Sequence, residues 1–225
     1  MSAVEEKKIA ALEAVTYVKN GMNVGLGTGS TAYFMIEAIG EKVKQGLTIK
    51  AVATSLETEK HAKQLGIPIV TLAEAQRLDV TIDGADEVDD QLQLIKGGGG
   101  ALLREKIVAY NTDFNIIIAD ASKRVSKLGK FKLPLETIPF ATQLIIKELE
   151  SMGLSPKQRK NGSDNYKTDE SNDIVDVDIW NADMNPSDLE QTLKQIPGIV
   201  ETGLFLHSTD LVIIGEGEST IVFEK

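Results

Sequence analysis

The segment LDVTIDGADEVDDQLQLIKGGGGALLREKIVAYNTDFNIIIAD, residues 78–120, contains two short apolar runs with a longer periodic segment between them. The runs LDVTI and FNIIIAD are typical of buried strands, and ALLREKIVAYN is typical of a helix. Strands that alternate with helices in this way predict a parallel sheet covered on both faces.

The same alternation extends toward the N-terminus. The pattern predicts a helix over residues 3–19, a strand at MNVGLG (22–27), a helix that starts in TGSTAYFMIEAIGEKV (28–43), a strand at TIKAVAT (48–54), a helix ending at Gly66 and a strand at IPIVTL (67–72). Thr54 with Glu57, and Thr71 with Glu74, have the spacing of helix capping boxes.

Polar clusters stand where four of these strands end. Because ligands bind outside the carboxyl ends of parallel strands, we expect these clusters to lie along one edge of the sheet. They are Gly27–Thr31, Thr54-Ser55, Asp83–Asp86 and Asp120–Lys123.

The pattern changes near residue 130. From there to residue 206 the order is strand, helix, two strands, helix, strand, which suggests a ferredoxin-like α+β insert. TDLVIIGEG and TIVFEK then resemble strands that return to the main sheet. We therefore predict an α/β, Rossmann-like parallel-sheet domain from residues 1–130 and 207–225, with an inserted ferredoxin-like domain at 131–206.

Composition narrows the function classes. The formal net charge is −10, which disfavours nucleic acid as a partner and means that local donors must bind any anionic substrate. Cysteine is absent and there are only two histidines, so thiolate chemistry is excluded and a His-rich metal site is disfavoured, whereas a carboxylate Mg²⁺ site stays open. No membrane-spanning run or signal peptide is evident, so we expect a cytoplasmic protein with no membrane partner.

GLGTGSTA, residues 25–32, follows a strand and opens a helix. Its glycines would let the backbone approach a ligand, and the free N–H groups of a helix start suit a phosphate. It matches neither a Walker A loop nor a G-x-G-x-x-G motif. The other interpretation is a glycine-rich turn with a Ser/Thr cap.

The segment between residues 83 and 105 combines acids, a lysine and glycines. Asp83 and Asp86 suit sugar hydroxyls or acid/base work, or else simple helix capping. Lys96 and the four glycines after it fit a backbone wrapped against a ligand, or else a flexible loop. For Glu105 the ordinary role is a partner of the helix dipole, and for Lys7 and Lys123 a solvated surface lysine.

Taken together, the segments GLGTGSTA, IDGADEVD, KGGGGALLREKI, IADASK and IPGIVETGLF resemble the type A ribose-5-phosphate isomerases over essentially the whole chain. The resemblance implies the two-domain fold described above. It also implies the interconversion of D-ribose 5-phosphate and D-ribulose 5-phosphate in the pentose phosphate pathway, with no metal or other cofactor and with a homodimer or homotetramer as the assembly.

The resemblance also implies roles for single residues. Glu105 would be the base that moves a proton between C1 and C2, Asp83 would assist ring opening, and Asp86 and Lys96 would stabilise the enediolate. The remaining substrate-binding residues would be Thr28, Gly29, Ser30, Thr31, Gly84, Ala85, Gly97, Gly98, Gly99, Lys123 and, by a weaker correspondence, Lys7.

One departure from the family lies in the insert, where TDESN at Thr168–Asn172 stands in place of the frequent TDNGN. We expect it to affect hairpin turns or subunit contacts, and we expect the hairpin around Asn161–Asn165 to be dispensable for the chemistry. Two other functions stay open: a sugar-phosphate sensor, which would usually carry a DNA-binding segment, and a CoA transferase or deaminase of related fold. A deaminase would usually place a histidine near the acid pair, where neither His61 nor His207 stands.

Overall fold

The computed structural model describes residues 2–182 and 185–225. The chain forms two compact units. Unit 1 consists of the chain up to Ala85, Arg104–Arg124 and His207–Lys225, and unit 2 of Asp86–Leu103 and Val125–Leu206. The segment 86–103, which the sequence analysis placed in the first domain, therefore packs with the insert, and the domain boundaries given there stay a prediction.

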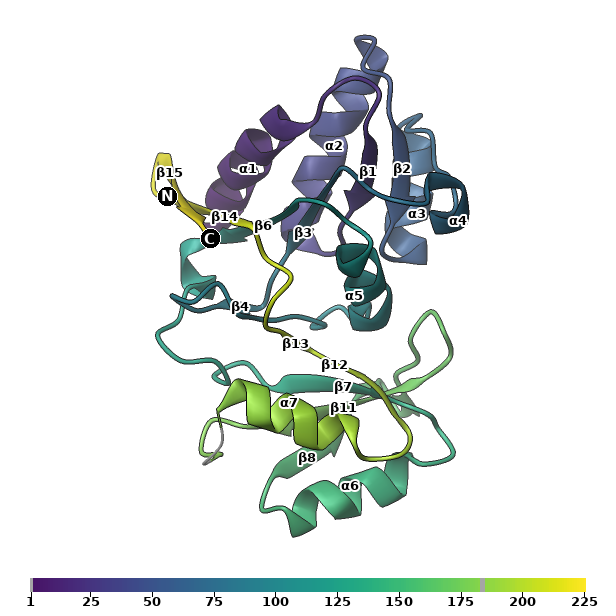
Figure 1. Ribbon diagram of the computed structural model, residues 1–225, viewed down its shortest axis with the longest axis vertical. Coiled ribbons are helices and arrows are strands. Elements are labelled where there is room, and N and C mark those ends of the chain that lie inside the picture. The colour runs from purple at the N-terminus through teal and green to yellow at the C-terminus, as the bar shows by residue number, and fades with distance from the viewer. Residues whose placement is uncertain (1, 183–184) are drawn as a thin grey trace. The chain divides into compact units, whose positions relative to one another are not determined.

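Unit 1 is built on a six-stranded sheet of order β15-β14-β6-β3-β1-β2 (Figure 1). Neighbouring strands are parallel except for the antiparallel pair β14 and β15. Their bounds are β1 Asn23–Leu26, β2 Lys50–Ala53, β3 Val80–Gly84, β6 Asn115–Asp120, β14 Leu211–Glu216 and β15 Ser219–Glu224.

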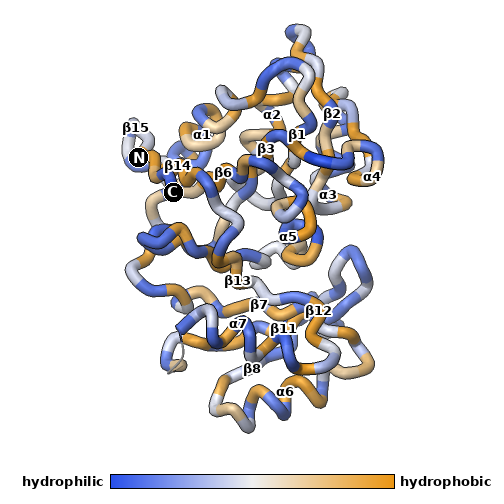
Figure 2. The backbone as a smooth tube through the Cα atoms, viewed as in Figure 1, coloured by the Kyte–Doolittle hydropathy of each residue, from blue (hydrophilic) through white to orange (hydrophobic). Residues whose placement is uncertain are grey.

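Helices pack on this sheet through the apolar side chains of its central strands, and Figure 2 shows the hydropathy along the backbone. One large cluster joins α1 and α2 to β1, β3 and β6, and a smaller one joins α4 and α5 to β2. The helices of unit 1 and its two short 3-10 turns are α1 Ala3–Ala14, η1 Val15–Tyr17, α2 Ser30–Lys44, α3 Leu56–Gln64, α4 Leu72–Ala75, α5 Leu102–Tyr110 and η2 Ala121–Lys123.

Two local predictions for this unit were wrong. Residues 67–72 do not form a strand, because only Ile69 bridges to Ala51. The N-cap of α3 is Ser55 and not Thr54. The Ser55 hydroxyl accepts the N–H of Thr58, so the cap lies one residue later in the chain than the predicted pair of Thr54 and Glu57. The predicted box of Thr71 and Glu74 is confirmed.

Unit 2 contains a four-stranded antiparallel sheet of order β12-β7-β11-β8. In chain order this is 4-1-3-2 with one helix after the first strand and one after the third, which confirms the ferredoxin-like prediction. The bounds are β7 Leu133–Thr137, α6 Thr142–Ser151, β8 Ser155–Gln158, β11 Asp173–Asp178, α7 Pro186–Lys194 and β12 Ile199–Thr202.

Unit 2 also contains a small sheet of order β13-β5-β4, which the sequence did not predict and which joins the segment after Asp86 to the end of the insert. The expected hairpin around Asn161–Asn165 is formed by β9 and β10, which follow β8. The bounds are β4 Glu87–Val88, β5 Leu94–Ile95, β9 Lys160–Asn161, β10 Asp164–Asn165 and β13 Leu204–Phe205.

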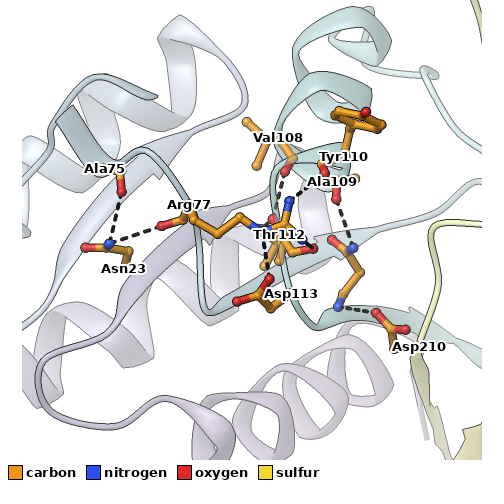
Figure 3. Close-up of polar contacts among 11 residues, drawn as sticks. Asn23, Ala75, Arg77, Val108, Ala109, Tyr110, Thr112, Asp113 and Asp210 are labelled. Carbon is orange, nitrogen blue, oxygen red and sulfur yellow. Dashed lines mark hydrogen bonds and ion pairs between the residues drawn. The ribbon is translucent and has the colours of Figure 1, made fainter. Parts of the chain in front are cut away.

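Polar contacts close the amino ends of the strands in unit 1 (Figure 3). The Asn23 amide donates to the carbonyls of Ala75 and Arg77, and the Arg77 guanidinium binds Asp113 at 2.6 Å and two further carbonyls. The backbone N–H of Asn115 donates to Asp210. The polar side chains at the amino ends of the strands are therefore used in contacts within the protein. The polar clusters at the carboxyl ends are the candidates for ligand binding. None of the helices in the described ranges is both long enough and apolar enough to span a membrane.

Candidate active site

Thr28 joins three of the predicted polar clusters at the carboxyl ends of the strands. Its hydroxyl lies 2.7 Å from the hydroxyl of Thr54 and 2.9 Å from that of Ser55, both of which follow β2. Its backbone N–H donates to Oδ1 of Asp83, on β3, at 3.0 Å. The expectation that the clusters after β1, β2 and β3 meet at one edge is therefore confirmed.

The glycines of GLGTGSTA have two different roles. A Cβ at Gly25 would lie 2.0 Å from the Thr81 hydroxyl, and one at Gly27 would lie 2.1 Å from Oδ1 of Asp83. These two glycines therefore make room for side chains of β3 and not for a ligand, which corrects the sequence interpretation. Only Gly29, with a φ of 106°, has the backbone conformation that favours glycine at the start of α2.

The first turn of α2 offers donors for an anion. The first N–H groups of a helix have no partner within the helix, and the helix dipole makes this end positive. Ser30 and Thr31 open the turn, and the Lys7 ammonium donates to the Ser30 hydroxyl at 3.0 Å and lies 3.8 Å from Asp120. Lys7 thus lies beside the loop, whereas its sequence gave only a weak reason to place it there.

Lys123 stands in the short turn η2, directly after β6. The Asp120 carboxylate caps this turn by accepting the N–H of Ser122. Since β6 is next to β3 in the sheet, the turn follows the fourth polar strand end of the predicted edge. Lys123 is partly exposed, so its ammonium can be offered to an anion without a large desolvation cost.

Asp83 is 3% exposed and is fixed by backbone groups. Its Oδ1 accepts the N–H of Gly84 at 2.7 Å as well as that of Thr28. Two hydrogen bonds from backbone N–H groups hold this carboxylate in one orientation. Gly84 and Ala85 then lead out of β3 toward Asp86 in the chain.

The glycine run lies in unit 2, together with Asp86. Oδ2 of Asp86 accepts the N–H of Gly98 at 2.7 Å, and a Cβ at Gly98 would lie 2.5 Å from the same carboxylate. Gly97 and Gly100 have φ values of 97° and 79°. The run is therefore an ordered loop with its own internal contacts, which disagrees with the alternative of a flexible loop.

In the sequence Lys96 precedes the glycine run and Glu105 follows it, and both side chains are buried. Lys96 is 3% exposed, its ammonium lies 5.4 Å from the centroid of the Phe205 ring, and its backbone N–H binds the carbonyl of Gly203. Glu105, in the first turn of α5, is 6% exposed. The sequence favoured an ordinary surface role for such a glutamate, so its burial is the observation that raises it to a functional candidate.

Two side chains that the sequence analysis did not single out contact the glycine run. Arg159 donates to the carbonyls of Gly97 and Gly98, and Tyr166 donates to that of Gly99. Both belong to a polar segment whose composition resembles an ordinary exposed hairpin, so no sequence signal distinguishes them. These contacts give a physical reason against the expectation that the hairpin is dispensable.

His61 makes its side-chain contacts with residues of α2. Its ring stacks on Tyr33 with centroids 4.6 Å apart and its Nε2 lies 2.6 Å from Glu37. Both rings line a hollow of about 550 Å³ that Thr28, Gly29, Ser30 and Lys7 also border. Across the described parts of the chain, no three or more His, Cys, Asp or Glu side chains are grouped so that they could hold a metal ion.

A family model and curated relatives point to one family. A family model described as ribose 5-phosphate isomerase A (phosphoriboisomerase A) matches residues 50–219. The ribose-5-phosphate isomerase A of Bacillus mycoides is 51% identical over 93% of this chain and 95% of its own length, and that of Listeria innocua is 48% identical over 99% of both.

Two solved structures of the family match this chain over its full length. A D-ribose-5-phosphate isomerase in complex with phospho-erythronic acid has a TM-score of 0.96 and 40% identity, and covers 100% of both chains. Ribose 5-phosphate isomerase A from Methanocaldococcus jannaschii has a TM-score of 0.94 and 41% identity, with the same coverage.

Proposed function

The chain belongs to the ribose 5-phosphate isomerase A family, and from that premise we propose how its own residues act on the substrate. The enzyme isomerises D-ribose 5-phosphate to D-ribulose 5-phosphate in the pentose phosphate pathway. This is an aldose–ketose isomerisation, so a proton must leave C2 and another must arrive at C1. The open-chain sugar must also be held by its phosphate.

The phosphate is bound at the start of α2. Ser30 and Thr31 supply hydroxyls and helix N–H groups, Thr28 and Gly29 lead the backbone into this turn, and the Lys7 ammonium, 3.0 Å from the Ser30 hydroxyl, adds positive charge. Lys123 adds a second cation from the turn after β6. This concentration of donors offsets the repulsion that a chain of net charge −10 exerts on an anionic sugar.

Glu105 is the base of the isomerisation. Its carboxylate accepts the proton from C2 of the open-chain aldose, which leaves a cis-enediolate with its negative charge on O1. The carboxylic acid then returns the proton to C1, and the hydroxyl proton of O2 passes to O1, so the product ketone forms without a net gain or loss of protons. One group suffices for both carbon steps because the proton leaves and returns along the same path.

The developing charge on the enediolate needs donors that are fixed before the reaction. The buried Lys96 ammonium and the backbone amides of the run Gly97–Gly99 supply them, with the Gly98 N–H serving to hold the Asp86 carboxylate at 2.7 Å and the Gly99 N–H left to face the oxyanion. Asp83, bound by two backbone amides, assists ring opening by accepting the proton of the anomeric hydroxyl as the C1–O4 bond breaks, and it returns this proton to O4, which becomes the C4 hydroxyl. Gly84 and Ala85, between the two aspartates, bind the sugar chain through their backbone.

The observation that carries this proposal is the burial of three ionisable side chains, since Asp83 and Lys96 are 3% exposed and Glu105 is 6% exposed. Burying a charged group costs free energy unless other groups compensate it. Such groups gather at functional sites, where a protected base and a preorganised cation have a chemical task.

The remaining expectations concern the assembly and its setting. We infer a homodimer or homotetramer in the cytoplasm that needs neither a metal nor another cofactor and has no nucleic-acid or membrane partner. The acidic net charge supports the inference on nucleic acid, because a basic face is what neutralises phosphates.

A direct assay tests the proposed function. The purified protein is mixed with ribose 5-phosphate in D₂O, and NMR follows ribulose 5-phosphate and the deuterium at its C1. We expect isomerisation with partial deuterium incorporation at C1, because the proton on Glu105 can exchange with solvent, and unchanged rates after exhaustive dialysis against EDTA. A rate that EDTA abolishes and Mg²⁺ or Mn²⁺ restores would contradict the metal-free proposal, and the absence of isomerisation would contradict the function itself.

A further inference from the structure

Arg159 lies between β8 and β9 of unit 2, with its side chain 14% exposed. Its Nε and Nη2 bind the two oxygens of Asp176 at 2.9 and 2.5 Å. Its remaining nitrogen, Nη1, donates to the carbonyl oxygen of Gly97 at 3.1 Å and to that of Gly98 at 3.0 Å. One guanidinium therefore joins a strand of the ferredoxin-like sheet to two successive peptide units of the glycine run.

Tyr166 secures the next peptide unit. Its hydroxyl donates to the carbonyl of Gly99 at 2.9 Å, and its ring centroid lies 5.6 Å from the Arg159 guanidinium carbon. A Cβ at Gly100 would lie 2.3 Å from the same hydroxyl, so the chain there must be glycine for Tyr166 to approach. Arg159 and Tyr166 thus bind three consecutive carbonyls, those of Gly97, Gly98 and Gly99.

These contacts decide where the amides of the run point. In a trans peptide unit the C=O and the following N–H point in opposite directions. The peptide between Gly97 and Gly98 turns its carbonyl to Arg159 and its N–H to Asp86, at 2.7 Å. The next peptide also turns its carbonyl to Arg159, so the N–H of Gly99 points away from the guanidinium, and Gly99 is exposed.

We propose that Arg159 and Tyr166 are positioning residues for the isomerisation, and that they act by aiming the amides of Gly98 and Gly99. The Gly98 amide fixes the Asp86 carboxylate, and the Gly99 amide is presented to the oxyanion of the enediolate. The inference rests on the proposed function, because it takes the glycine run as the oxyanion site. Both are proposed to act through the backbone of the glycine run and not by contact with the substrate.

The chemistry of arginine explains why this position needs it. The planar guanidinium places its donors in fixed directions, so one side can bind a carboxylate with two bonds while the other gathers two carbonyls. A lysine ammonium keeps the charge but cannot reach both groups in a fixed geometry. The Arg159→Lys variant therefore tests geometry and leaves the net charge unchanged.

The matched control is Arg77→Lys in unit 1. Arg77 also binds a carboxylate, that of Asp113, and two carbonyls, but at the amino ends of the strands (Figure 3). We expect folded Arg159→Lys to lose roughly 10- to 100-fold in kcat, the usual effect of a misplaced oxyanion donor, with a much smaller change in KM. Arg77→Lys keeps the kcat of the unaltered protein.

A second readout separates positioning from general support of the fold. Amide hydrogen exchange, followed by NMR, reports on the Gly98 N–H directly. We expect faster exchange at Gly98 in Arg159→Lys and unchanged exchange in the core of the ferredoxin-like sheet, at Val175 for example. A folded Arg159→Lys variant with the original kcat, or one whose kcat falls while exchange at Gly98 stays the same, would overturn the proposal.

Tyr166→Phe decides the case if Arg159→Lys does not fold. This variant removes only the hydroxyl that binds the Gly99 carbonyl, and we expect roughly a tenfold lower kcat with faster exchange at Gly100. An unchanged kcat and unchanged exchange in that variant would contradict the inference. If the unaltered protein isomerises ribose 5-phosphate and these variants do so equally well, only this inference fails. An inactive unaltered protein would contradict the proposed function and the inference with it.

Discussion

At the scale of single residues, burial separates Lys96 and Glu105, which we propose act in the chemical step, from Lys123, which we propose binds the phosphate. Lys96 is 3% exposed and Glu105 6%, whereas Lys123 is partly exposed and Lys8 is exposed. A desolvated group contributes strongly to the stabilisation of charge in a transition state, and a solvated one contributes mainly to binding. The two kinds of residue should therefore differ in which kinetic constant they change.

Lys123→Ala should weaken substrate binding more than turnover. Loss of one charge-assisted contact to the phosphate should raise KM by roughly 10-fold or more, with kcat nearly unchanged. Steady-state kinetics with ribose 5-phosphate measure both constants. Lys8→Ala removes the same charge from an exposed site on α1 and serves as the control. An unchanged KM with a large fall in kcat would argue against the phosphate role of Lys123.

The residue types and their order were enough to propose Asp83, Asp86, Lys96 and Glu105 as site residues, but the sequence alone could not predict their burial or their contacts. It also could not predict why glycine is required at several positions. Gly27 makes room for Asp83, and Gly100 makes room for Tyr166, because residues 56 or more positions away in the chain approach them. Such contacts depend on the tertiary fold and leave no local pattern.

At the scale of elements, the long apolar strands and the helices were predictable because their periodicity is strong. The failures are short elements. Residues 67–72 are apolar but pair at only one position, and β4, β5 and β13 have two residues each, too few for a pattern. The turn at Thr168–Asn172 is where the sequence differs from the TDNGN that is frequent in the family. The backbone of this turn indicates how the difference affects stability.

Ser171 has a φ of 64° at the end of that turn. The backbone N–H of Thr168 donates to the carbonyl of Asn172 across the turn, so the three residues between them form a hairpin loop. The last residue of such a loop has a positive φ, which favours glycine at position 171. Ser171→Gly should therefore stabilise the protein by about 0.5–1 kcal/mol, since relief of left-handed strain exceeds the entropy that glycine adds to the unfolded chain. Urea unfolding measures it. Ser151→Gly, within α6, is the control and should destabilise.

Glu136 on β7 gives the unit a predictable dependence on pH. It is 1% exposed, and burial raises the pKa of its carboxyl above the ordinary value of 4.5 despite hydrogen bonds from Asn172 and Thr168. The folded state therefore holds this proton more tightly than the unfolded state. The resulting contribution to stability is complete below pH 4.5 and is lost as pH rises through the raised pKa.

The test compares wild type with Glu136→Gln, which cannot titrate. The free energy of unfolding of the wild type, relative to the variant, should fall as pH increases from below 4.5 toward neutrality. Urea unfolding at a series of pH values gives this difference, and Glu148→Gln, at an exposed site on α6, controls for the removal of a carboxylate. A difference that does not vary with pH would show that Glu136 titrates alike in both states.

At the scale of the whole molecule, an acidic protein binds an acidic substrate. The net charge of −10 repels a sugar phosphate at long range, so we propose that binding depends on local donors at the start of α2 and on a few lysines. In unit 1, Lys7 lies beside this helix start and donates to the Ser30 hydroxyl, which supports the proposal. Unit 2 contributes an ordered glycine run rather than a flexible one.

The central claim is that Glu105 moves the proton, and the Glu105→Gln variant tests it most directly. Glutamine keeps the size of the side chain but cannot accept a proton from C2. With ribose 5-phosphate, kcat should fall by at least about 10²–10⁴-fold while substrate binding is nearly intact. Glu5→Gln, at an exposed glutamate in the first turn of α1, should keep the original rate. A folded Glu105→Gln protein with near wild-type kcat would contradict the account and return Asp83 or Asp86 to the role of base.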